Sequence, residues 1–202
     1  MHSADNAIIQ RILAGNVHAY AELVNRHKAR GMTLAMRMLN NREDAEEALQ
    51  DAFVRAFRAL PKFEMKSSFA TWFYRIVFNV CSSALQKRGE TFVISLEDEE
   101  EGLAFAVPPS DSSPDVHAES AEFNRIVGEE IGRLPAAYRA VVTLFFVQDM
   151  SYDEIVEVTG MPLGTVKTHL FRARVLLREA IGKRFKDNVN FAGDVAMKKE
   201  RV

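Results

Sequence analysis

The sequence predicts an all-α protein of two small helical domains, an N-terminal helical bundle and a C-terminal four-helix domain with a helix-turn-helix, joined by a flexible acidic linker. Apolar residues recur at helical spacing through both halves of the chain, and no segment shows a convincing two-residue alternation. Between the halves, residues 91–119 are rich in acidic residues, proline and serine. Such a stretch cannot bury enough apolar surface to fold alone.

Composition narrows the class of protein. With 202 residues and 48% hydrophobic content, the chain can build a packed core, and no apolar run approaches the ~20 residues that span a bilayer. The single cysteine, Cys81, excludes an intramolecular disulfide, fits a reducing cytoplasm and is expected to be buried. Residues 90–122 hold ten acidic residues and no Lys or Arg, so the net charge of −2 conceals two basic flanking parts.

The N-terminal domain, residues 1–90, begins with two predicted helices. A short helix is expected around residues 5–14, and a longer one carries apolar residues at helical spacing from Tyr20 to Met38. His27 falls on the core-facing stripe of the second helix. We therefore expect a buried structural histidine there rather than a ligand.

Two more helices complete this domain. One begins at Asn41, with Glu43 and Asp44 in its first turn, and continues to Leu60. The other begins near Ser67 or Ser68 and ends near Arg88.

That last helix is apolar on two sides. Phe78 points about 180° away from Phe69, and Tyr74 and Leu85 lie on the same far side as Phe78. A helix with two apolar sides needs two neighbours. The second neighbour is either another helix or nucleic acid whose unpaired bases stack on the aromatic rings.

The C-terminal domain, residues 120–182, contains the helix-turn-helix. Ser151 and Glu154 form a capping-box pair that starts its first helix. Gly160 and Pro162 mark the turn, since Gly tolerates a left-handed cap and Pro suits a following first turn.

The second helix of this motif has an apolar side and a basic side. The apolar stripe is formed by Val166, Leu170, Ala173 and Leu177. The opposite side carries cations, a hydroxyl and an aromatic ring, namely Lys167, Thr168, Phe171, Arg172 and Arg174. An ordinary solvated basic helix would look similar, but the turn and the capped preceding helix favour contact with the major groove of DNA.

Three segments, in chain order, resemble a bacterial extracytoplasmic-function (ECF) sigma factor of the sigma-70 family. Residues 44–57 are similar to the family's helix that binds core RNA polymerase, and residues 67–79 to the segment that melts and reads the minus-ten promoter element. Residues 134–139, followed by the helix-turn-helix, resemble the domain that binds the minus-thirty-five element. The resemblance covers nearly all of residues 5–182.

The resemblance implies two sites in the N-terminal domain. The β and β′ subunits of core polymerase would dock on the helix of residues 43–60, through the polar residues Asp44, Glu46, Glu47, Gln50, Asp51 and Arg55. Single-stranded minus-ten DNA would be bound by Lys62, Phe63, Lys66, Arg75 and Asn79. A flipped base would enter a pocket beside Phe63 and Asn79, at an unstacking cost of a few kcal/mol. We interpret Trp72 as structural.

In the C-terminal domain, the resemblance implies that Lys167, Thr168, Phe171, Arg172 and Arg174 face the duplex minus-thirty-five element. It also implies an anti-sigma factor that holds the chain inactive, sometimes at the inner membrane. The expected location is the bacterial cytoplasm and nucleoid, without direct membrane insertion. Residues 183–202 have no assigned role, although Lys183 and its neighbours could extend the second helix.

The chain departs from the family pattern at several positions. Met65 replaces a Gly frequent in the base-capture loop, and His169 stands where an Arg is often found. Val156 and Thr159 replace a common Ala and Leu in the helix-turn-helix.

Three functions fit parts of this pattern. The leading hypothesis is a promoter-specificity subunit of RNA polymerase with no cofactor, metal or catalytic chemistry, because no phosphate-cradling Gly loop, nucleophile elbow or metal-spaced His/Cys cluster occurs. The second is a conventional transcription factor that binds duplex DNA as a dimer, but this chain shows no obvious dimerisation helix. An adaptor or anti-sigma antagonist would not need the basic recognition face.

Overall fold

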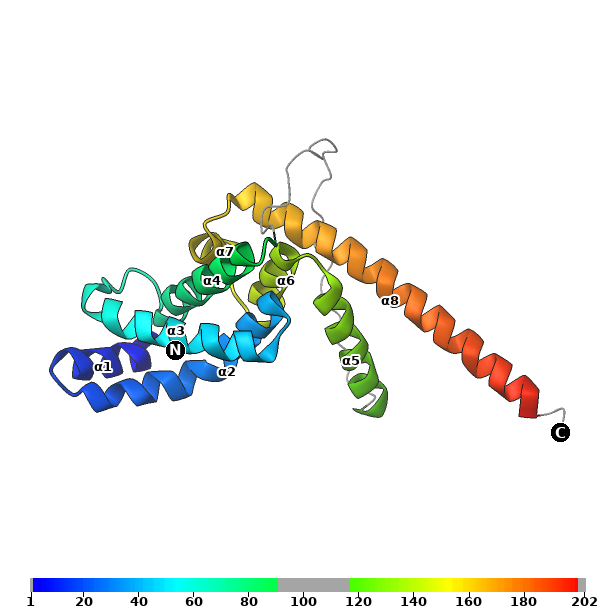
Figure 1. Cartoon of the computed structure of the whole chain (residues 1–202), viewed down its shortest axis with the longest axis horizontal. Helices are drawn as coiled ribbons and strands as arrows, with labels where there is room; N and C mark the ends of the chain where they lie inside the picture. The colour runs from blue at the N-terminus through cyan, green and yellow to red at the C-terminus, as the bar shows by residue number, and fades with distance from the viewer. Residues whose placement is uncertain (1, 91–116, 200–202) are drawn as a thin grey trace.

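The computed structural model describes residues 2–90 and 117–199, and within those ranges every regular element is helical, as predicted. The N-terminal domain comprises α1 (His2–Leu13), the 3₁₀ turn η1 (Val17–Ala19), α2 (Tyr20–Leu39), α3 (Arg42–Ala59), the 3₁₀ turn η2 (Leu60–Lys62) and α4 (Phe69–Lys87). The C-terminal domain comprises α5 (His117–Arg133), α6 (Ala136–Val142), the π-helical turn η4 (Thr143–Val147), α7 (Tyr152–Thr159) and α8 (Leu163–Lys199), as Figure 1 shows.

Side-chain caps define where the helices of the first domain begin. The Asn41 side chain accepts a hydrogen bond from the Asp44 backbone N–H at 3.1 Å and so starts α3. Ser68 does the same for the Thr71 N–H at 2.9 Å and starts α4. Each bond satisfies one of the donors that a helix leaves free at its N-terminus. Both predicted starting points are therefore confirmed.

The close packing of α2, α3 and α4 depends on Gly31. A Cβ atom at this position would lie 2.8 Å from Leu49 Cδ1 and 3.2 Å from Phe73 Cε1. A larger residue here would force the Leu49 and Phe73 side chains to shift. Beside this contact, His27 is buried as predicted and packs near the Phe69 ring, with centroids 5.0 Å apart.

The helix-turn-helix forms as its residues predict. Ser151 and Glu154 make both hydrogen bonds of the capping box at the start of α7. Gly160 ends α7 with a φ of +72°, in the left-handed region that favours glycine. The second helix of the motif, α8, continues to Lys199 and therefore extends well beyond the predicted domain end at residue 182.

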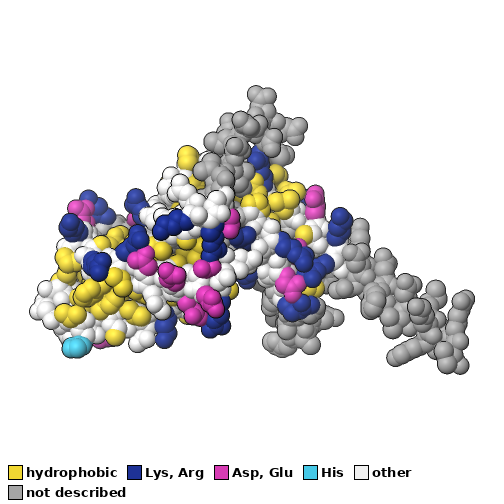
Figure 2. All heavy atoms as spheres, in the orientation of Figure 1, with side chains coloured by type: hydrophobic (Ala, Val, Ile, Leu, Met, Phe, Trp, Pro, Cys, Tyr) yellow, Lys and Arg dark blue, Asp and Glu magenta, His cyan; other side chains and the backbone are white. Residues whose placement is uncertain are grey.

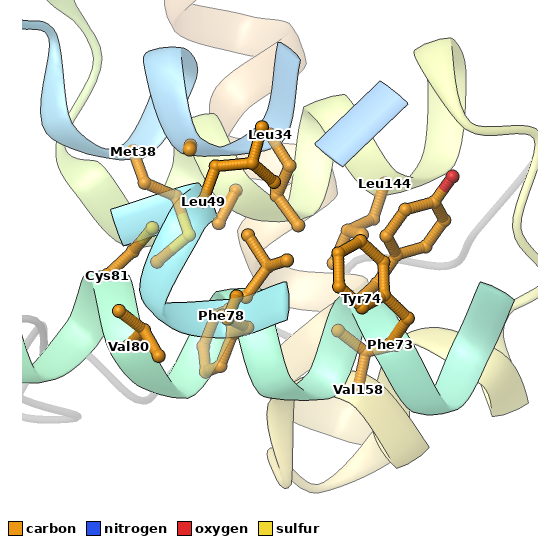
Figure 3. Close-up of a cluster of buried hydrophobic side chains, with 14 of the residues drawn as sticks. Leu34, Met38, Leu49, Phe73, Tyr74, Phe78, Val80, Cys81, Leu144 and Val158 are labelled. Carbon is orange, nitrogen blue, oxygen red and sulfur yellow. The ribbon is translucent and has the colours of Figure 1, made fainter. Parts of the chain in front are cut away.

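The two domains pack directly against each other, with α7 along α4 and with α6 and η4 against α2. Tyr74 and Phe78, on the second apolar side of α4, are both buried. Their core is continuous with that of the second domain, where Leu144 and Val158 lie close to the Tyr74 ring (Figure 3). The second neighbour of α4 is therefore a helix of the same chain, which decides between the two alternatives left open by the sequence.

Two further expectations concern the core and the linker. Cys81 is fully buried, as predicted, and burial raises the pKa of its thiol to about 12. Most of the predicted acidic linker, residues 91–116, lies outside the described residues, whereas residues 117–119 already belong to α5. No helix in the described ranges is both long and apolar enough to cross a membrane.

Candidate nucleic-acid interface

The first part of α8 presents its basic side away from the core. Val166, Leu170 and Ala173 are buried and Leu177 is partly buried, so the predicted inward stripe is confirmed. Lys167 extends over the Tyr152 ring of α7, with its Nζ 5.9 Å from the ring centroid. This cation–π contact fixes the lysine at the start of the helix, where a recognition helix meets base edges.

The remaining predicted residues continue this surface along α8. Thr168, Phe171 and Arg172 are partly exposed, and Arg174 is exposed. Together with Lys167 they form one face, which we call the recognition face. Its chemistry combines guanidinium and ammonium donors with a hydroxyl and an apolar ring, the groups that bind phosphates, base edges and thymine methyls.

His169 lies on the opposite side of α8 from this face. Its ring is buried against Tyr138, with centroids 5.0 Å apart in an edge-on arrangement. Burial, with a smaller contribution from the charge of Arg172, lowers the pKa of His169, so the imidazole is neutral at pH 7. The histidine therefore packs between helices in the position where the family often has an arginine.

Arg75 and Asn79 are exposed one helical turn apart on α4. Trp72 lies on the same side of the helix, about 20° from Asn79 and about 60° from Arg75 around its axis, and is half-buried. An aromatic ring, a cation and an amide therefore share one side of α4, away from the side that α7 covers. Sequence reasoning assigned Trp72 to the core alone, although the helical spacing of residues 72, 75 and 79 already places it beside the other two.

Phe63 belongs to this region but is buried in the core and does not lie on the surface. It is buried and packs against Trp72, with ring centroids 4.8 Å apart, and edge-on against Phe69 at 6.2 Å. Phe63 supports the half-exposed Trp72 ring and leaves little surface of its own for a base. Lys62 and Lys66 are exposed on either side of it, with Lys66 in an ion pair with Glu64.

The loop that joins η2 to α4 holds Met65 in a left-handed conformation. Its φ is +55°, and the residue is exposed. A left-handed backbone favours Gly. The loop therefore keeps the conformation expected of the Gly that Met65 replaces.

Three acidic residues of the predicted polymerase-binding face of α3 form ion pairs with arginines of the same domain. Asp44 forms an ion pair with Arg88, the residue directly after α4, Glu46 with Arg42 at 2.8 Å, and Asp51 with Arg55 at 2.8 Å. Glu47 and Gln50 are exposed. The apolar residues Val54 and Phe57 are also exposed on this helix, and Figure 2 shows hydrophobic and charged side chains side by side over the first domain.

Sequence reasoning missed the arginine contacts that join the domains. Arg139 of α6 is buried and donates to the carbonyl oxygens of Arg37 and Met38 at 2.6 and 2.8 Å, which caps the C-terminal end of α2. Arg37 in turn donates to the Gly128 carbonyl of α5 at 2.6 Å. No local pattern signals a partner about a hundred residues away.

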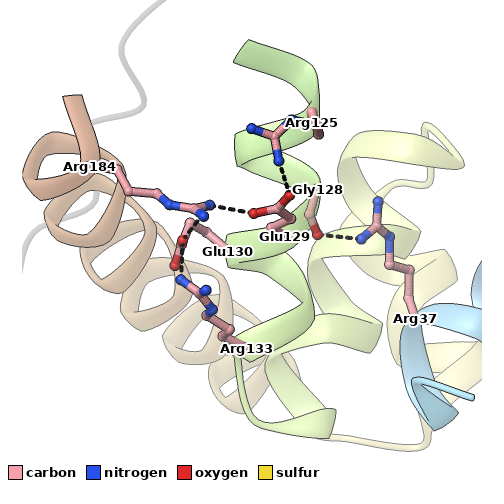
Figure 4. A network of polar contacts seen from close by, with 7 residues as sticks. All are labelled: Arg37, Arg125, Gly128, Glu129, Glu130, Arg133 and Arg184. Carbon is pink, nitrogen blue, oxygen red and sulfur yellow. Dashed lines mark hydrogen bonds and ion pairs between the residues drawn. The ribbon is translucent and has the colours of Figure 1, made fainter. Parts of the chain in front are cut away.

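A second polar network ties α5 to α8 (Figure 4). Arg184 pairs with Glu129 at 2.6 Å and with Glu130 at 3.2 Å. Arg133 also pairs with Glu130, and Arg125 with Glu129. Arg184 and Arg125 lower the pKa of Glu129, with the hydrogen bond from Arg184 as the main cause. The network holds α5 beside the helix that bears the recognition face.

Among the residues described, no group of three or more His, Cys, Asp or Glu side chains is arranged to hold a metal ion. The surfaces that gather functional groups are the recognition face, the Trp72–Arg75–Asn79 side of α4 and the polar face of α3. Two of the three offer cations beside aromatic rings, which is the chemistry of nucleic-acid contact.

Comparison with known proteins agrees with this arrangement. The family model for sigma-70 region 2 matches residues 23–91, and that for sigma-70 region 4 matches residues 124–177. The chain is 31% identical over 176 residues to the ECF RNA polymerase sigma factor SigW of Bacillus subtilis, covering 86% of this chain and 94% of that protein.

Solved structures share the fold. The structure of CnrH in complex with the cytosolic domain of CnrY aligns with a TM-score of 0.61 at 24% identity, over 89% of this chain and 98% of that one. The sigma factor RpoE of Bartonella quintana, in complex with the anti-sigma factor NepR, aligns with a TM-score of 0.57 at 22% identity, over 81% of this chain and 96% of that one. With its two matched regions and its relatives over most of their length, the chain belongs to the ECF RNA polymerase sigma factors.

Proposed function

We propose that this chain confers promoter specificity on bacterial RNA polymerase, by binding the core enzyme through α3 and promoter DNA through α4 and α8. The observation that carries the proposal is the joint presence, in one chain, of a helix-turn-helix recognition face and an aromatic–cation–amide side on a second helix. It acts as a binding protein in the cytoplasm, at the nucleoid, and contributes no catalytic step of its own.

The recognition face would bind the minus-thirty-five element as a duplex. Lys167, Arg172 and Arg174 supply phosphate and base-edge donors, while Thr168 and Phe171 offer a hydroxyl and an apolar contact. Phosphate contacts position the helix in the groove, and contacts to base edges set its sequence preference.

The side of α4 that carries Arg75 and Asn79 would bind the separated nontemplate strand at the minus-ten element. The half-exposed Trp72 ring supplies a stacking surface, and Phe63 supports it from the core. Lys62 and Lys66 would hold backbone phosphates, and the Asn79 amide can pair with the edge of a flipped base.

Core polymerase would dock on α3. Its exposed or partly exposed polar groups (Asp44, Glu46, Glu47, Gln50, Asp51 and Arg55) share the helix with the exposed apolar residues Val54 and Phe57. An apolar centre with a polar rim is the usual composition of a protein interface. The β and β′ subunits are the partners that family membership indicates.

An anti-sigma factor is a further proposed partner. It would hold the chain inactive by covering surfaces needed by polymerase. The fold match to a sigma factor solved with an anti-sigma factor supports this partner class.

Run-off transcription with purified core polymerase tests the proposal. Core plus this chain should initiate at a promoter selected from a random library, and core alone should not. Asn79→Ala should reduce strand opening, read by permanganate reactivity of unpaired thymines, and leave binding to an upstream duplex intact. Tight duplex binding without any effect on initiation would instead indicate a conventional transcription factor.

A further inference from the structure

We propose that Tyr152, which lies outside the predicted recognition face, is a positioning residue for base readout. Its ring, supported by Phe145, holds Lys167 in the conformation in which the ammonium reads one base pair of the minus-thirty-five element. The inference rests on the proposed function and deepens it. It separates a cation that is ordered before DNA binds from the other cations of the same face.

Tyr152 is fixed by stacking at the start of the helix-turn-helix. It is the first residue of α7, directly after the N-cap Ser151. Its ring lies 5.2 Å from that of Phe145, centroid to centroid, and the two planes are 19° apart. Both side chains are partly buried and pack against the core. A tyrosine side chain has only two torsions, so a stacked neighbour leaves its ring little freedom.

Phe145 belongs to the π-helical turn η4. In this turn the Gln148 backbone N–H donates to the Thr143 carbonyl, five residues back, at 3.1 Å. Phe145 faces Tyr152, whereas Phe146 is exposed and meets Phe145 edge-on, with centroids 4.9 Å apart. Single turns of this kind inside helices are frequent at functional sites. Here the turn supplies the aromatic support for Tyr152.

Lys167 contacts this ring from α8. Its Nζ lies 5.9 Å from the Tyr152 ring centroid, within the range of a cation–π contact. The contact ties the tip of a flexible side chain to the helix that precedes α8 in the motif. A carboxylate at the same place would neutralise the ammonium. The ring leaves its charge uncompensated and its N–H donors available to acceptors on DNA.

The place of Lys167 favours a base edge over a phosphate. Lys167 is the fifth residue of α8, and the N-terminal residues of a recognition helix are the ones that contact base edges. An ammonium matches the two acceptors of a guanine edge, N7 and O6, in the major groove. Such a contact requires a defined position of the Nζ atom. Because ordering a lysine costs much rotamer freedom, a ring that orders it beforehand favours binding.

Arg174 is the natural contrast on the same face. It lies seven residues after Lys167, about 20° away around the axis of α8, and is exposed. An exposed guanidinium keeps its rotamer freedom and can neutralise a phosphate from several conformations. Arg174 therefore serves as the matched control for Lys167.

Base preferences of the holoenzyme test the proposal. A promoter selected by the parent holoenzyme is changed one base pair at a time through the minus-thirty-five element, and relative affinities are measured for each variant chain. Lys167→Ala should lose the preference at one base pair, by about 5- to 150-fold. Tyr152→Leu should lower the preference at that same pair about two- to fivefold, the effect of one cation–π contact. The other pairs should keep their preferences.

A double-mutant cycle separates positioning from a general loosening of the motif. Tyr152→Phe keeps the ring and should keep the parent preference. In the Lys167→Ala background, Tyr152→Leu should have no further effect at the pair that Lys167 reads. In the Arg174→Ala background, it should keep its full effect there. A loosened motif would instead weaken the preference at every pair alike.

Nuclear magnetic resonance of the free full-length chain tests the contact itself. The ring current of Tyr152 should move the Lys167 Cε protons upfield of those of the other lysines. Their signal is assigned by its loss in Lys167→Ala. The upfield shift should vanish in Tyr152→Leu and persist in Tyr152→Phe. An unshifted Lys167 signal in the parent chain would overturn the proposal.

Three outcomes with the holoenzyme would also overturn it. Tyr152→Leu could strengthen the preference, which would mean that the ring holds Lys167 away from DNA. Tyr152→Leu could leave every pair unchanged or weaken all pairs equally, or Tyr152→Phe could behave like Tyr152→Leu. A parent holoenzyme without any preference in the upstream element would instead refute the proposed function, so the two failures are distinguishable.

Discussion

At the scale of single residues, the loop before α4 stores strain at one position. Met65 has a φ of +55°, and the residue is 36% exposed, so most of its surface is buried. A non-glycine residue in a sparsely populated backbone region costs about 1–3 kcal/mol.

Met65→Gly should therefore be more stable than Met65→Ala by about 1 kcal/mol, because both variants lose the methionine side chain and only Ala keeps the left-handed strain. Relief of the strain exceeds the roughly 0.5–1 kcal/mol that the extra freedom of Gly costs in the unfolded chain. Met65→Ala keeps the strain and should not stabilise. Urea denaturation of the two variants measures the difference, and a more stable Ala variant would contradict the strain argument.

The buried His27 also acts as a single titrating group. Its Nε2 lies 3.1 Å from Asp5 Oδ2, and its Nδ1 has no hydrogen-bond partner. Burial lowers the pKa of His27 despite the opposing attraction of Asp5. The imidazole is therefore neutral near pH 7 and donates its Nε2 proton to the carboxylate, a tautomer inferred from these contacts.

This pKa direction predicts how stability depends on pH. Unfolded, His27 titrates near 6.5, above its folded pKa, so below about pH 6.5 the unfolded chain binds more protons and the free energy of unfolding falls. His27→Gln should reduce this slope by at most about 1.4 kcal/mol per pH unit. His169, whose pKa is lowered in the same direction, supplies a remaining slope. Denaturation at pH 5, 6 and 7 compares the chains, and identical slopes in the two would count against a neutral buried His27.

At the scale of elements, the first domain is organised by how closely its helices approach. Gly31 lies where α2 faces both Leu49 of α3 and Phe73 of α4. In contrast, Gly182 lies in the exposed middle of α8, where a Cβ atom would have no neighbour within 4 Å. Glycine therefore allows close helix packing at position 31, whereas at position 182 no neighbouring atom requires it.

Gly31→Ala should destabilise the chain by about 1 kcal/mol, because overpacking costs about 1–3 kcal/mol and exceeds the gain in helix propensity of about 1 kcal/mol. Gly182→Ala should stabilise by up to about 1 kcal/mol, since only the propensity changes. Thermal or urea denaturation gives both values. A stabilising Gly31→Ala would indicate that Leu49 and Phe73 yield without cost.

The recognition face of α8 allows a prediction for one helix. If Arg172 contacts a phosphate, Arg172→Ala should weaken duplex binding and reduce the slope of log K against log salt concentration by about 0.9. Titrations of a labelled minus-thirty-five duplex at several salt concentrations measure both effects. Arg58→Ala, an exposed arginine on α3, is the control and should keep the parent slope. Equal slopes in Arg172→Ala and the parent would exclude the phosphate contact.

At the scale of the whole molecule, Arg139 connects the domains. Besides its two bonds to α2, its guanidinium donates to the carbonyls of Leu134 and Gly132 at 2.6 and 3.3 Å within its own domain. Burial lowers the pKa of Arg139, but an arginine remains charged. One buried cation therefore satisfies carbonyl groups at the end of two helices in different domains.

Arg139→Met should lower the free energy of unfolding by roughly 3 kcal/mol, because it leaves buried carbonyl oxygens without donors. Arg139→Lys should lose much of the same stability, since an ammonium cannot reproduce the planar fork of donors. Arg133→Ala, which removes a largely exposed side chain, should cost less than about 1 kcal/mol. Chemical denaturation compares the three, and a neutral Arg139→Met would show that water replaces the guanidinium.

The sequence by itself determined the elements and much of the recognition face. The capping residues Asn41, Ser68 and Ser151, the turn at Gly160 and the inward stripe of α8 act over a few residues, so local spacing and hydrogen bonding suffice to predict them. Family resemblance located the candidate minus-ten and polymerase-binding residues. It did not reveal that Phe63 is buried beneath Trp72, because burial depends on the path of a loop whose strained residue is a methionine.

Only the tertiary structure decided what lies against the second apolar side of α4. The pattern of Tyr74 and Phe78 required a partner, and any sufficiently apolar surface would have satisfied it. The choice of α7 depends on bonds from Arg139 and Gln148 to the backbone of α2, more than a hundred residues away. Backbone carbonyls are the same in every residue type, so a sequence pattern cannot specify which of them a distant side chain will find.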